Sequence, residues 1–333
     1  MADNHRILYA RVAHGAPVPE DFAADVTAIP EAGDGQILVR NIYLALEPYY
    51  RNVMKGLPLY GIPLKPGDVM YGDTIAQVIA SRNAQWQAGD YVLGRGGWQQ
   101  YCVLDGAAAR KLESGSAPMS TALGVLGTPG LTGFVGMVYL APPRPGQTVA
   151  VSAATGPVGS TAGQTARMMG ARVVGIAGSA QKCKYAVDVL GFDECVNYRD
   201  GELKSALKRA CPDGIDVYFD NVGGATLEAA LSALRVHGRI IACGRISNYN
   251  DKTPQPGPRN LSNITTKRLT IKGLIVSDWL AQKDEFEKEV GGYLQAGSLK
   301  NKETVVDGID QAVGAFIGLF EGKNVGKMVV KLA

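Results

Sequence analysis

Hydrophobic and polar positions follow two different patterns along the 333-residue chain. Up to about residue 120, short apolar or alternating runs are interrupted by Gly, Pro and Asp. The clearest of these runs are GQILVRNIYLAL (35–46), DTIAQVIAS (73–81) and DYVLGRGGWQQYCVL (90–104). Alternation with period two and frequent turn residues are typical of half-buried strands. This part of the chain is therefore predicted to be β-rich, as a small barrel or sandwich.

From about residue 125, apolar strand-like runs alternate with helix-like segments. The predicted strands are 147–153, 172–178, 194–198, 215–222, 238–244 and 269–276, and the predicted helices between them are 159–170, 180–191, 202–211 and 225–235. Strands that alternate with helices in this way are typical of α/β proteins with a doubly wound parallel sheet. We therefore predict an α/β fold with six parallel strands.

The C-terminal tail ends in KMVVKL (327–332), a run that suits a strand added to the first domain. The resulting domain prediction is 1–124 together with 300–333, and 125–299.

Composition narrows the class of protein without identifying it. The chain is 46% hydrophobic and 20% charged, with a net charge of +3 and no basic run, so neither nucleic acid nor a membrane is an expected partner. The five cysteines form no Cys-x-x-Cys pair, which argues against a disulfide framework or a zinc ribbon, and Cys102 and Cys243 are expected to be core residues. Because the start of the chain has no apolar signal core, we expect a cytoplasmic protein.

The first chemical motif is AATGPVGSTAGQ (153–164), which follows a predicted strand and opens a predicted helix. Compared with G-x-G-x-x-G, Ala154 replaces the first glycine, whereas Gly156 and Gly159 are in place. Gly156 would admit a pyrophosphate close to the backbone, and Gly159 would let the helix pack tightly. The alternative is an ordinary turn between strand and helix.

The end of the second predicted strand indicates which dinucleotide this motif would bind. NAD sites place an Asp or Glu there for the ribose 2′-hydroxyl, but the chain has Ala177-Gly178-Ser179, with Lys182 shortly after. A missing carboxylate and a nearby cation favour a 2′-phosphate, and so NADPH. The alternative for Lys182 is a solvated lysine at the start of a helix.

Metal and serine-nucleophile chemistry have little support. The chain has only three histidines, His5, His14 and His237, and no His-Glu pair in VMYGDTIAQV. No G-x-S-x-G elbow occurs. We predict that no metal is bound and that His237 is a surface turn residue.

Several motifs taken together resemble the zinc-free branch of the medium-chain dehydrogenase/reductase superfamily. The resemblance is closer to the leukotriene B4 12-hydroxydehydrogenase/prostaglandin reductase family of alkenal double-bond reductases, and closest to its bacterial NADPH-dependent curcumin/dihydrocurcumin reductases. The motifs are HGAPVPEDF, YLALEPYYR, VLGRGGWQQY, LGVLGTPGLTGF, AATGPVGSTAGQ, DNVGG, ACGRISNYN and GKNVGKMVV. One departure is Glu47-Pro48-Tyr49-Tyr50, because relatives usually have Asp before the proline and Met in place of the second tyrosine.

The resemblance implies a Rossmann domain that binds NADPH, a GroES-like β-barrel domain for the substrate, and by analogy a homodimer. The cofactor contacts that it implies are Gly156, Pro157, Val158, Gly159, Ser179, Lys182, Tyr198, Asn221, Cys243, Gly244, Ile246, Ser247, Tyr249, Leu274, Ile275, Val276 and Asn324.

The implied reaction is hydride transfer from NADPH to the β-carbon of an α,β-unsaturated ketone or aldehyde. Tyr249 is the candidate donor to the enolate oxygen, with a loop-capping tyrosine as the alternative. Tyr60 is either a second donor, a wall of the substrate pocket or a loop anchor, and Tyr49 either lines the pocket or packs in the core. Two other functions stay open: a zinc-free quinone reductase, and an NADPH-binding protein without turnover.

Overall fold

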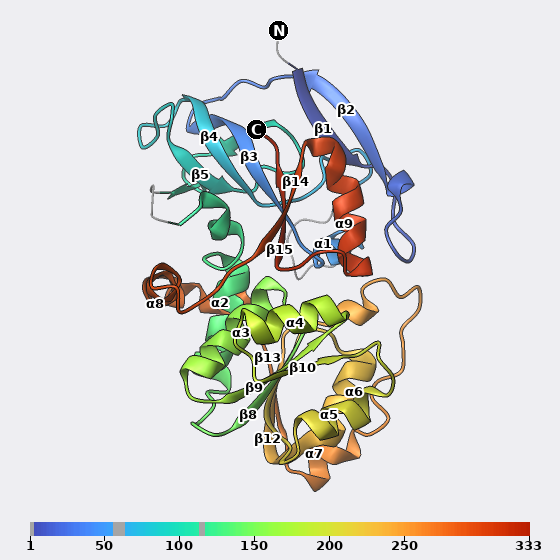
Figure 1. Ribbon diagram of the computed structural model, residues 1–333. Helices are drawn as coiled ribbons and strands as arrows, with labels where there is room; N and C mark the ends of the chain where they lie inside the picture. Colours follow the sequence, from blue (N-terminus) through green and yellow to red (C-terminus); the bar gives the residue numbers. More distant parts are fainter. Residues whose placement is uncertain (1–2, 56–63, 113–116) are drawn as a thin grey trace. The chain divides into compact units, whose positions relative to one another are not determined.

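A computed structural model describes residues 3–55, 64–112 and 117–333 of the chain (Figure 1). The chain divides into two compact units. The first unit is Met1–Leu123 together with Glu303–Ala333, and the second unit is Gly124–Lys302. The assignment of cofactor binding to the second unit and substrate binding to the first stays a prediction. No helix in the described ranges is long and apolar enough to cross a membrane.

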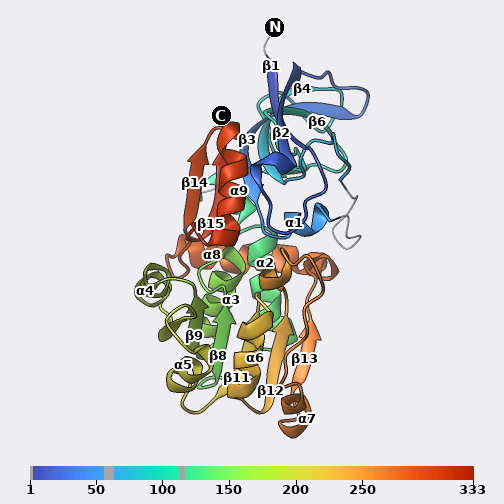
Figure 2. The ribbon, with the colours of Figure 1, turned by 90° about the vertical axis from the view of Figure 1, so that its right-hand side faces the viewer.

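The second unit is built on a six-stranded sheet with the strand order β10-β9-β8-β11-β12-β13, in which every pair is parallel (Figure 2). Numbered from the first strand of the unit, this order is the 3-2-1-4-5-6 arrangement of a doubly wound dinucleotide-binding fold. The predicted α/β class and parallel sheet are therefore confirmed. The strands are β8 (Thr148–Ser152), β9 (Arg172–Ala177), β10 (Glu194–Asn197), β11 (Ile215–Asp220), β12 (Leu234–Ala242) and β13 (Thr270–Gly273).

Helices cover both faces of this sheet, which explains why its central strands are apolar at successive positions. Val149 and Val151 of β8 belong to one core cluster, whereas Ala150 between them belongs to the other. The first cluster includes residues of α2, α3 and α8, and the second includes residues of α5 and α6. The helices of the unit are α2 (Thr128–Val135, continued by the π-helical turn Gly136–Leu140), α3 (Pro157–Met168), α4 (Ala180–Asp188), α5 (Leu203–Ala210), α6 (Gly224–Ala233), α7 (Ser262–Thr266) and α8 (Lys283–Gln295).

Strand β12 differs from the prediction because it begins at Leu234 rather than Gly238. Leu234 pairs with Ile215, but the next pair in the register is Arg239 with Val217, so residues 235–238 bulge out of the ladder. His237 lies in this bulge, exposed and with a φ of 65°. It is thus a surface residue within a strand and not in a turn between elements.

The first unit contains a separate, mainly antiparallel sheet with the order β14-β15-β3-β4-β5-β7, in which β6 also pairs with β3, and a two-stranded β1-β2 sheet. Its elements are β1 (Asp3–Tyr9), β2 (Phe22–Ala28), β3 (Gln36–Leu46), α1 (Tyr50–Val53), β4 (Thr74–Ser81), β5 (Tyr91–Gly94), β6 (Tyr101–Asp105), β7 (Arg110–Leu112), β14 (Glu303–Asp307), α9 (Ala312–Glu321) and β15 (Lys327–Lys331). The separate β-rich domain is thus present, as the fold prediction required.

The C-terminal segment completes the sheet of the first unit. Strand β15 pairs antiparallel with β3, with Met328 opposite Leu46, and β14 pairs parallel with β15 (Figure 1). Parallel neighbours need a crossover connection, and α9 provides it. Phe316 of α9 packs edge-to-face in the core against Phe22 and Trp98, so distant segments of the chain share one apolar core.

Candidate functional site

Most of the candidate cofactor residues follow the carboxyl ends of the parallel strands in the second unit. These ends form one edge of the sheet, where ligands bind in open α/β folds. Gly156–Gly159 follow β8, Ser179 and Lys182 follow β9, Tyr198 follows β10, Asn221 follows β11, Cys243–Tyr249 follow β12, and Leu274–Val276 follow β13. The fold thus gathers residues spread over 120 positions of sequence at one edge.

In the loop after β8, Gly156 and Gly159 are glycines for different structural reasons. A Cβ on Gly159 would lie 2.5 Å from the Ala153 carbonyl oxygen and 3.1 Å from the Ala154 Cα, so the packing of α3 on the loop requires glycine there. A Cβ on Gly156 would meet only the Ala153 oxygen, at 3.3 Å, and the φ of Gly156 is an ordinary −72°. Since the fold hardly requires glycine at position 156, the bare backbone there suits the close approach of a ligand.

Helix α3 begins directly at this loop with Gly156 as its N-cap and Pro157 as its first residue. Pro157 has no N–H, and the Ser160 N–H donates to the Gly156 carbonyl oxygen over 2.8 Å. By helix geometry the N–H groups of Val158 and Gly159 have no acceptor within the helix. Together with the helix dipole they form a site suited to a phosphate oxygen.

The loop after β9 holds a half-buried lysine and no carboxylate. Ser179 caps α4, because its hydroxyl oxygen accepts a hydrogen bond from the Lys182 N–H over 3.2 Å. Burial, and then the positive charge of Arg199, lower the pKa of Lys182. A lysine that lies near a second cation is stabilised by an anion bound beside it.

Arg199, which sequence reasoning missed, brings the second positive charge to this loop. Its guanidinium lies 5.7 Å from the centre of the Tyr198 ring, and that ring packs against Gly178, where a Cβ would come within 2.8 Å of the Tyr198 hydroxyl oxygen. The signal in the sequence was an arginine directly after Tyr198, a predicted cofactor contact. Lys182, Tyr198 and Arg199 together form a site that suits a dianionic phosphate.

A buried carboxylate that sequence reasoning also missed shapes the loop after β11. One oxygen of Asp220 accepts hydrogen bonds from the Val222 N–H (3.0 Å), the Gly223 N–H (2.9 Å) and the Tyr218 hydroxyl (2.9 Å). Gly223 has a φ of 71°, which favours glycine. The signal in the sequence was Asp220-Asn221-Val222-Gly223-Gly224, in which an Asp precedes a pair of glycines by three positions, a pattern compatible with an Asx turn.

Asn221 is fixed by the neighbouring strand β8. Its backbone N–H donates to the Ser152 hydroxyl oxygen over 2.9 Å, and its side-chain amide donates to the Ser152 carbonyl oxygen over 2.8 Å. The loop after β12 then hydrogen-bonds to this one, because the Gly244 N–H donates to the Asp220 carbonyl oxygen and the Ser247 hydroxyl donates to the Val222 carbonyl oxygen. The two loops therefore form one rigid wall of the sheet edge.

Tyr249 is brought to this wall by the short 3₁₀ turn Ile246–Asn248. Its side chain is only 9% exposed, and its hydroxyl oxygen lies 3.5 Å from the position of a Cβ on Gly244. The hydroxyl thus lies beside the carboxyl end of β12, next to a glycine that leaves space. This position is compatible with a hydrogen-bond donor at the sheet edge.

Three sequence candidates lie elsewhere in the chain. Tyr49 and Asn324 belong to the first unit, where the Tyr49 ring lies 4.8 Å from that of Tyr50 and the Asn324 amide donates to the Gly326 carbonyl oxygen over 2.7 Å. Burial raises the pKa of Tyr49 well above its usual value, so its hydroxyl stays protonated. Tyr60 lies outside the described residues.

The cysteines expected to pack in the core are poor nucleophiles. Cys102 is buried, and Cys243 packs against the core of the second unit. Burial raises the pKa of each thiol to about 12. Neither therefore forms a thiolate readily at neutral pH.

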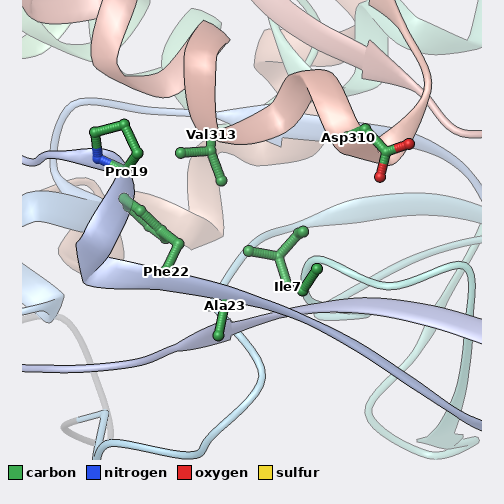
Figure 3. A pocket seen from close by; sticks show the side chains of 7 residues that line it. Ile7, Pro19, Phe22, Ala23, Asp310 and Val313 are labelled. Atoms are coloured by element: carbon green, nitrogen blue, oxygen red, sulfur yellow. The ribbon is translucent and has the colours of Figure 1, made fainter.

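A hollow of about 250 Å³ in the first unit contains none of the candidate residues (Figure 3). It is lined by Ile7, Pro19, Phe22, Ala23, Ala24, Asp310 and Val313, from the β1-β2 hairpin, the 3₁₀ turn Ile309–Gln311 and the start of α9. Figure 3 shows Ile7, Phe22 and Val313 around it, with Asp310 as the charged lining residue. A single carboxylate among apolar side chains offers no chemistry for the candidate reaction.

Comparison with known proteins now places the chain in a family. Residues 5–112 match the family model described as the N-terminal domain of oxidoreductase, and residues 157–291 match the model described as zinc-binding dehydrogenase. The chain is 41% identical over 335 residues to the NADPH-dependent curcumin reductase of Escherichia coli K12, covering 99% of this chain and 97% of the relative. The chain belongs to the medium-chain dehydrogenase/reductase family.

Other members of this family extend the comparison. The 2-alkenal reductase (NADP⁺-dependent) of Nicotiana tabacum is 37% identical over 337 residues and covers 99% of this chain and 98% of its own length. The crystal structure of CurA from Vibrio vulnificus in complex with NADPH is 40% identical, with a TM-score of 0.93 and 99% coverage of both chains. The likeness therefore extends over both units of this reductase-family member.

The second family model is named for zinc, but zinc ligands are lacking in the described ranges. Among residues 3–55, 64–112 and 117–333, no group of three or more His, Cys, Asp or Glu side chains is arranged to hold a metal ion. Metal independence stays a prediction.

Proposed function

We propose that this protein is an NADPH-dependent reductase of the carbon–carbon double bond in α,β-unsaturated ketones and aldehydes. The observation that carries the proposal is the full-length similarity to enzymes named as a curcumin reductase and a 2-alkenal reductase, both dependent on NADPH. The site residues of the second unit fit such an enzyme.

The preference for NADPH is supported by the loops after β9 and β10. Lys182 and Arg199 supply two positive charges, and Ala177-Gly178-Ser179 supplies no carboxylate that would repel a 2′-phosphate. Gly156 and the start of α3 would hold the pyrophosphate. When bound, NADPH supplies the hydride for the β-carbon of the substrate.

Tyr249 is the proposed electrostatic catalyst. As the double bond is reduced, negative charge builds on the carbonyl oxygen of the substrate, and a hydroxyl directed at that oxygen lowers the barrier. The Tyr249 hydroxyl lies beside Gly244 at the carboxyl end of β12, on the edge proposed for the cofactor. Asp220 and Ser152 are positioning residues, because they hold the loops after β11 and β12.

Replacing the Tyr249 hydroxyl tests this role. Tyr249→Phe should lower kcat about 10- to 100-fold, less than the loss of a sole oxyanion donor, because a ribose hydroxyl of the bound cofactor would supply a second donor. The affinity for NADPH should change little, since the ring remains. Tyr293→Phe, at a half-exposed position of α8, is the matched control and should leave kcat unchanged. A kcat within about threefold of the parent's in Tyr249→Phe would assign this tyrosine a structural role.

The substrate class is tested with a panel of an enone, an alkenal and a quinone, by following NADPH oxidation and identifying the products. The proposal predicts saturated ketones and aldehydes as products. Consumption of NADPH with the quinone alone would favour a quinone reductase. Binding of NADPH without turnover on any panel member would favour a non-catalytic protein.

We also propose a cytoplasmic homodimer. Strand β13 ends the six-stranded sheet and is exposed along its whole length, and Ile271 within it and Ile275 just after it are each more than 40% exposed. An exposed edge strand is suited to pairing with a second copy. Light scattering on the purified protein should give twice the mass of the chain, and Ile271→Glu should reduce it to one chain. A monomeric parent protein would refute the dimer.

A further inference from the structure

Two free cysteines of the second unit have their sulfur atoms next to each other. Cys183 lies in the first turn of α4 and Cys195 in β10, and their Sγ atoms are 3.0 Å apart. Both side chains are half-buried, and Cys195 packs against the core of the unit. Neither cysteine has a part in the proposed reduction, which leaves the pairing unexplained by that function.

The pairing depends on a glycine in β9, the strand next to β10. Cys195 lies opposite Gly175 in the ladder of β10 and β9, and a Cβ on Gly175 would lie only 3.0 Å from the Cys195 sulfur. The absent side chain therefore leaves room for this sulfur to lie over β9. Cys183 reaches the same place from α4, whose first turn is held by the hydrogen bond from the Cys183 N–H to the Ser179 carbonyl oxygen over 3.0 Å.

The two thiols differ in their surroundings. Burial raises the pKa of both, but the Cys195 S–H donates a hydrogen bond to the Cys183 sulfur, which partly offsets the effect at Cys183. Of the two thiols, Cys183 therefore ionises more readily and is the one that attacks an oxidant, and Cys195 is the resolving partner. Because burial still raises the pKa of Cys183 above its ordinary value, this attack is slow at neutral pH and accelerates as the pH rises.

We propose that Cys183 and Cys195 form a reversible thiol–disulfide site whose oxidant is a hydroperoxide. The Cys183 thiolate attacks the peroxide oxygen, which breaks the O–O bond and yields a sulfenic acid, with the peroxide's other oxygen leaving as water or an alcohol. The Cys195 sulfur then attacks the sulfenic sulfur, and a second molecule of water leaves with the thiol proton. The protein loses two hydrogen atoms, and the peroxide gains two electrons.

The disulfide would connect two elements of the proposed phosphate site, and this consequence rests on the proposed function. Helix α4 carries Lys182 and its cap Ser179, and β10 leads directly into Tyr198. A disulfide needs its sulfurs about 2 Å apart, so the two Sγ atoms must approach each other by about 1 Å, and we expect part of this approach to come from a shift of α4 against β10. We expect this displacement of Lys182 relative to Tyr198 to weaken NADPH binding.

The site is tested by treating the full-length reduced protein with hydrogen peroxide and mapping peptides without reduction. Chymotrypsin suits the digest, because cleavage after Tyr185 and Phe192 separates the two cysteines, whereas trypsin cuts on both sides of Cys183-Lys184. The proposal predicts a linked Cys183–Cys195 peptide that is lost on treatment with dithiothreitol. Cys183→Ser and Cys195→Ser should abolish it, and Cys211→Ser, at a buried core position, should not. Absence of the linked peptide in the folded parent protein would overturn the proposal.

The effect on the cofactor is a separate measurement. Peroxide treatment should raise KM for NADPH at least threefold with kcat retained, and dithiothreitol should restore KM. In Cys195→Ser, KM after dithiothreitol should be the same with and without peroxide treatment. A linked peptide with unchanged KM would overturn the coupling to the cofactor site. Because peptide mapping requires no turnover, failure of the disulfide and failure of the proposed reductase activity are distinguishable.

Discussion

Alanine at each glycine of the loop after β8 separates the needs of the fold from those of the cofactor. At position 159, the new Cβ would lie 2.5 Å from the Ala153 carbonyl oxygen and 3.0 Å from its carbon. Both are backbone atoms, which cannot rotate away as a side chain would. At position 156, the nearest atom is the same oxygen at 3.3 Å, so a shift of a few tenths of an ångström relieves the contact.

These distances lead to different magnitudes. Forcing an extra carbon into a packed site costs about 1–3 kcal/mol, and the better helix propensity of alanine returns up to about 1 kcal/mol. We therefore expect Gly159→Ala to lower the free energy of unfolding by about 1–2 kcal/mol. Gly156→Ala affects only an N-cap that forms no side-chain hydrogen bond, so we expect a loss of less than about 1 kcal/mol.

For NADPH affinity we expect the opposite order. Gly156→Ala should weaken NADPH binding more than Gly159→Ala does, although it destabilises the fold less. The Cβ at position 156 would occupy the space through which the pyrophosphate of NADPH approaches the backbone. Each loss of about 1.4 kcal/mol in binding free energy would appear as a tenfold rise in Kd. The assays are urea unfolding, with the m-value checked for constancy, and titration of NADPH fluorescence on the folded variants. A Gly159→Ala variant as stable as the parent would refute the packing argument. A Gly156→Ala variant with unchanged Kd would refute the pyrophosphate assignment.

Three further predictions concern other parts of the chain. Lys182→Ala should weaken NADPH binding by about 1.5–3 kcal/mol, the scale of a hydrogen bond to a charged group, and spare NADH; equal losses for both cofactors, measured as Kd, would remove the 2′-phosphate role. Burial, and then the charge of Glu47, raise the pKa of Asp73 from 3.8 to about 6, so the native state holds this proton to higher pH than the unfolded chain and stability falls as pH rises from about 4 to 6. Since the Asp73 side chain is 32% exposed, solvent screening limits the expected loss of unfolding free energy to about 1–2 kcal/mol. Asp73→Asn should abolish this pH dependence, measured by urea unfolding at pH 4 to 7. The same pH dependence in both proteins would contradict the assignment. Chelation should leave reductase activity intact and elemental analysis should find zinc well below one per chain, so stoichiometric zinc with activity lost on chelation would contradict metal independence.

The parallel sheet was predictable because its sequence signals are local. Five of the six strands are four to six residues long and β12 has nine, and strand-like segments alternate with helix-like segments, so the order of elements alone indicates the fold. The bulge at His237 was not predictable, because it arises from the pairing of β12 with β11. The apolar run KMVVKL predicted that the last strand joins the first domain, and β15 does pair there, but the identity of its partner β3, nearly 300 positions away, left no local signal.

The candidate site shows the same division between local and distant causes. Gly156, Gly159 and Lys182 were identifiable because their role depends on the position just after a strand. Asp220 and Arg199 had local signals that were overlooked, namely the glycines after the aspartate and the tyrosine before the arginine. The meeting of Cys183 and Cys195 had none, because it depends on the space that Gly175 leaves in a neighbouring strand.

The destination of the hydride tests the central claim most directly. An enone is incubated with the protein and NADPH deuterated at C4 of the nicotinamide, with each stereoisomer of the label used in turn, and the product is analysed by nuclear magnetic resonance. The account predicts that one of the two labels gives a saturated ketone with deuterium on the β-carbon. An allylic alcohol with deuterium on the former carbonyl carbon, or a saturated ketone without deuterium from either label, would contradict it.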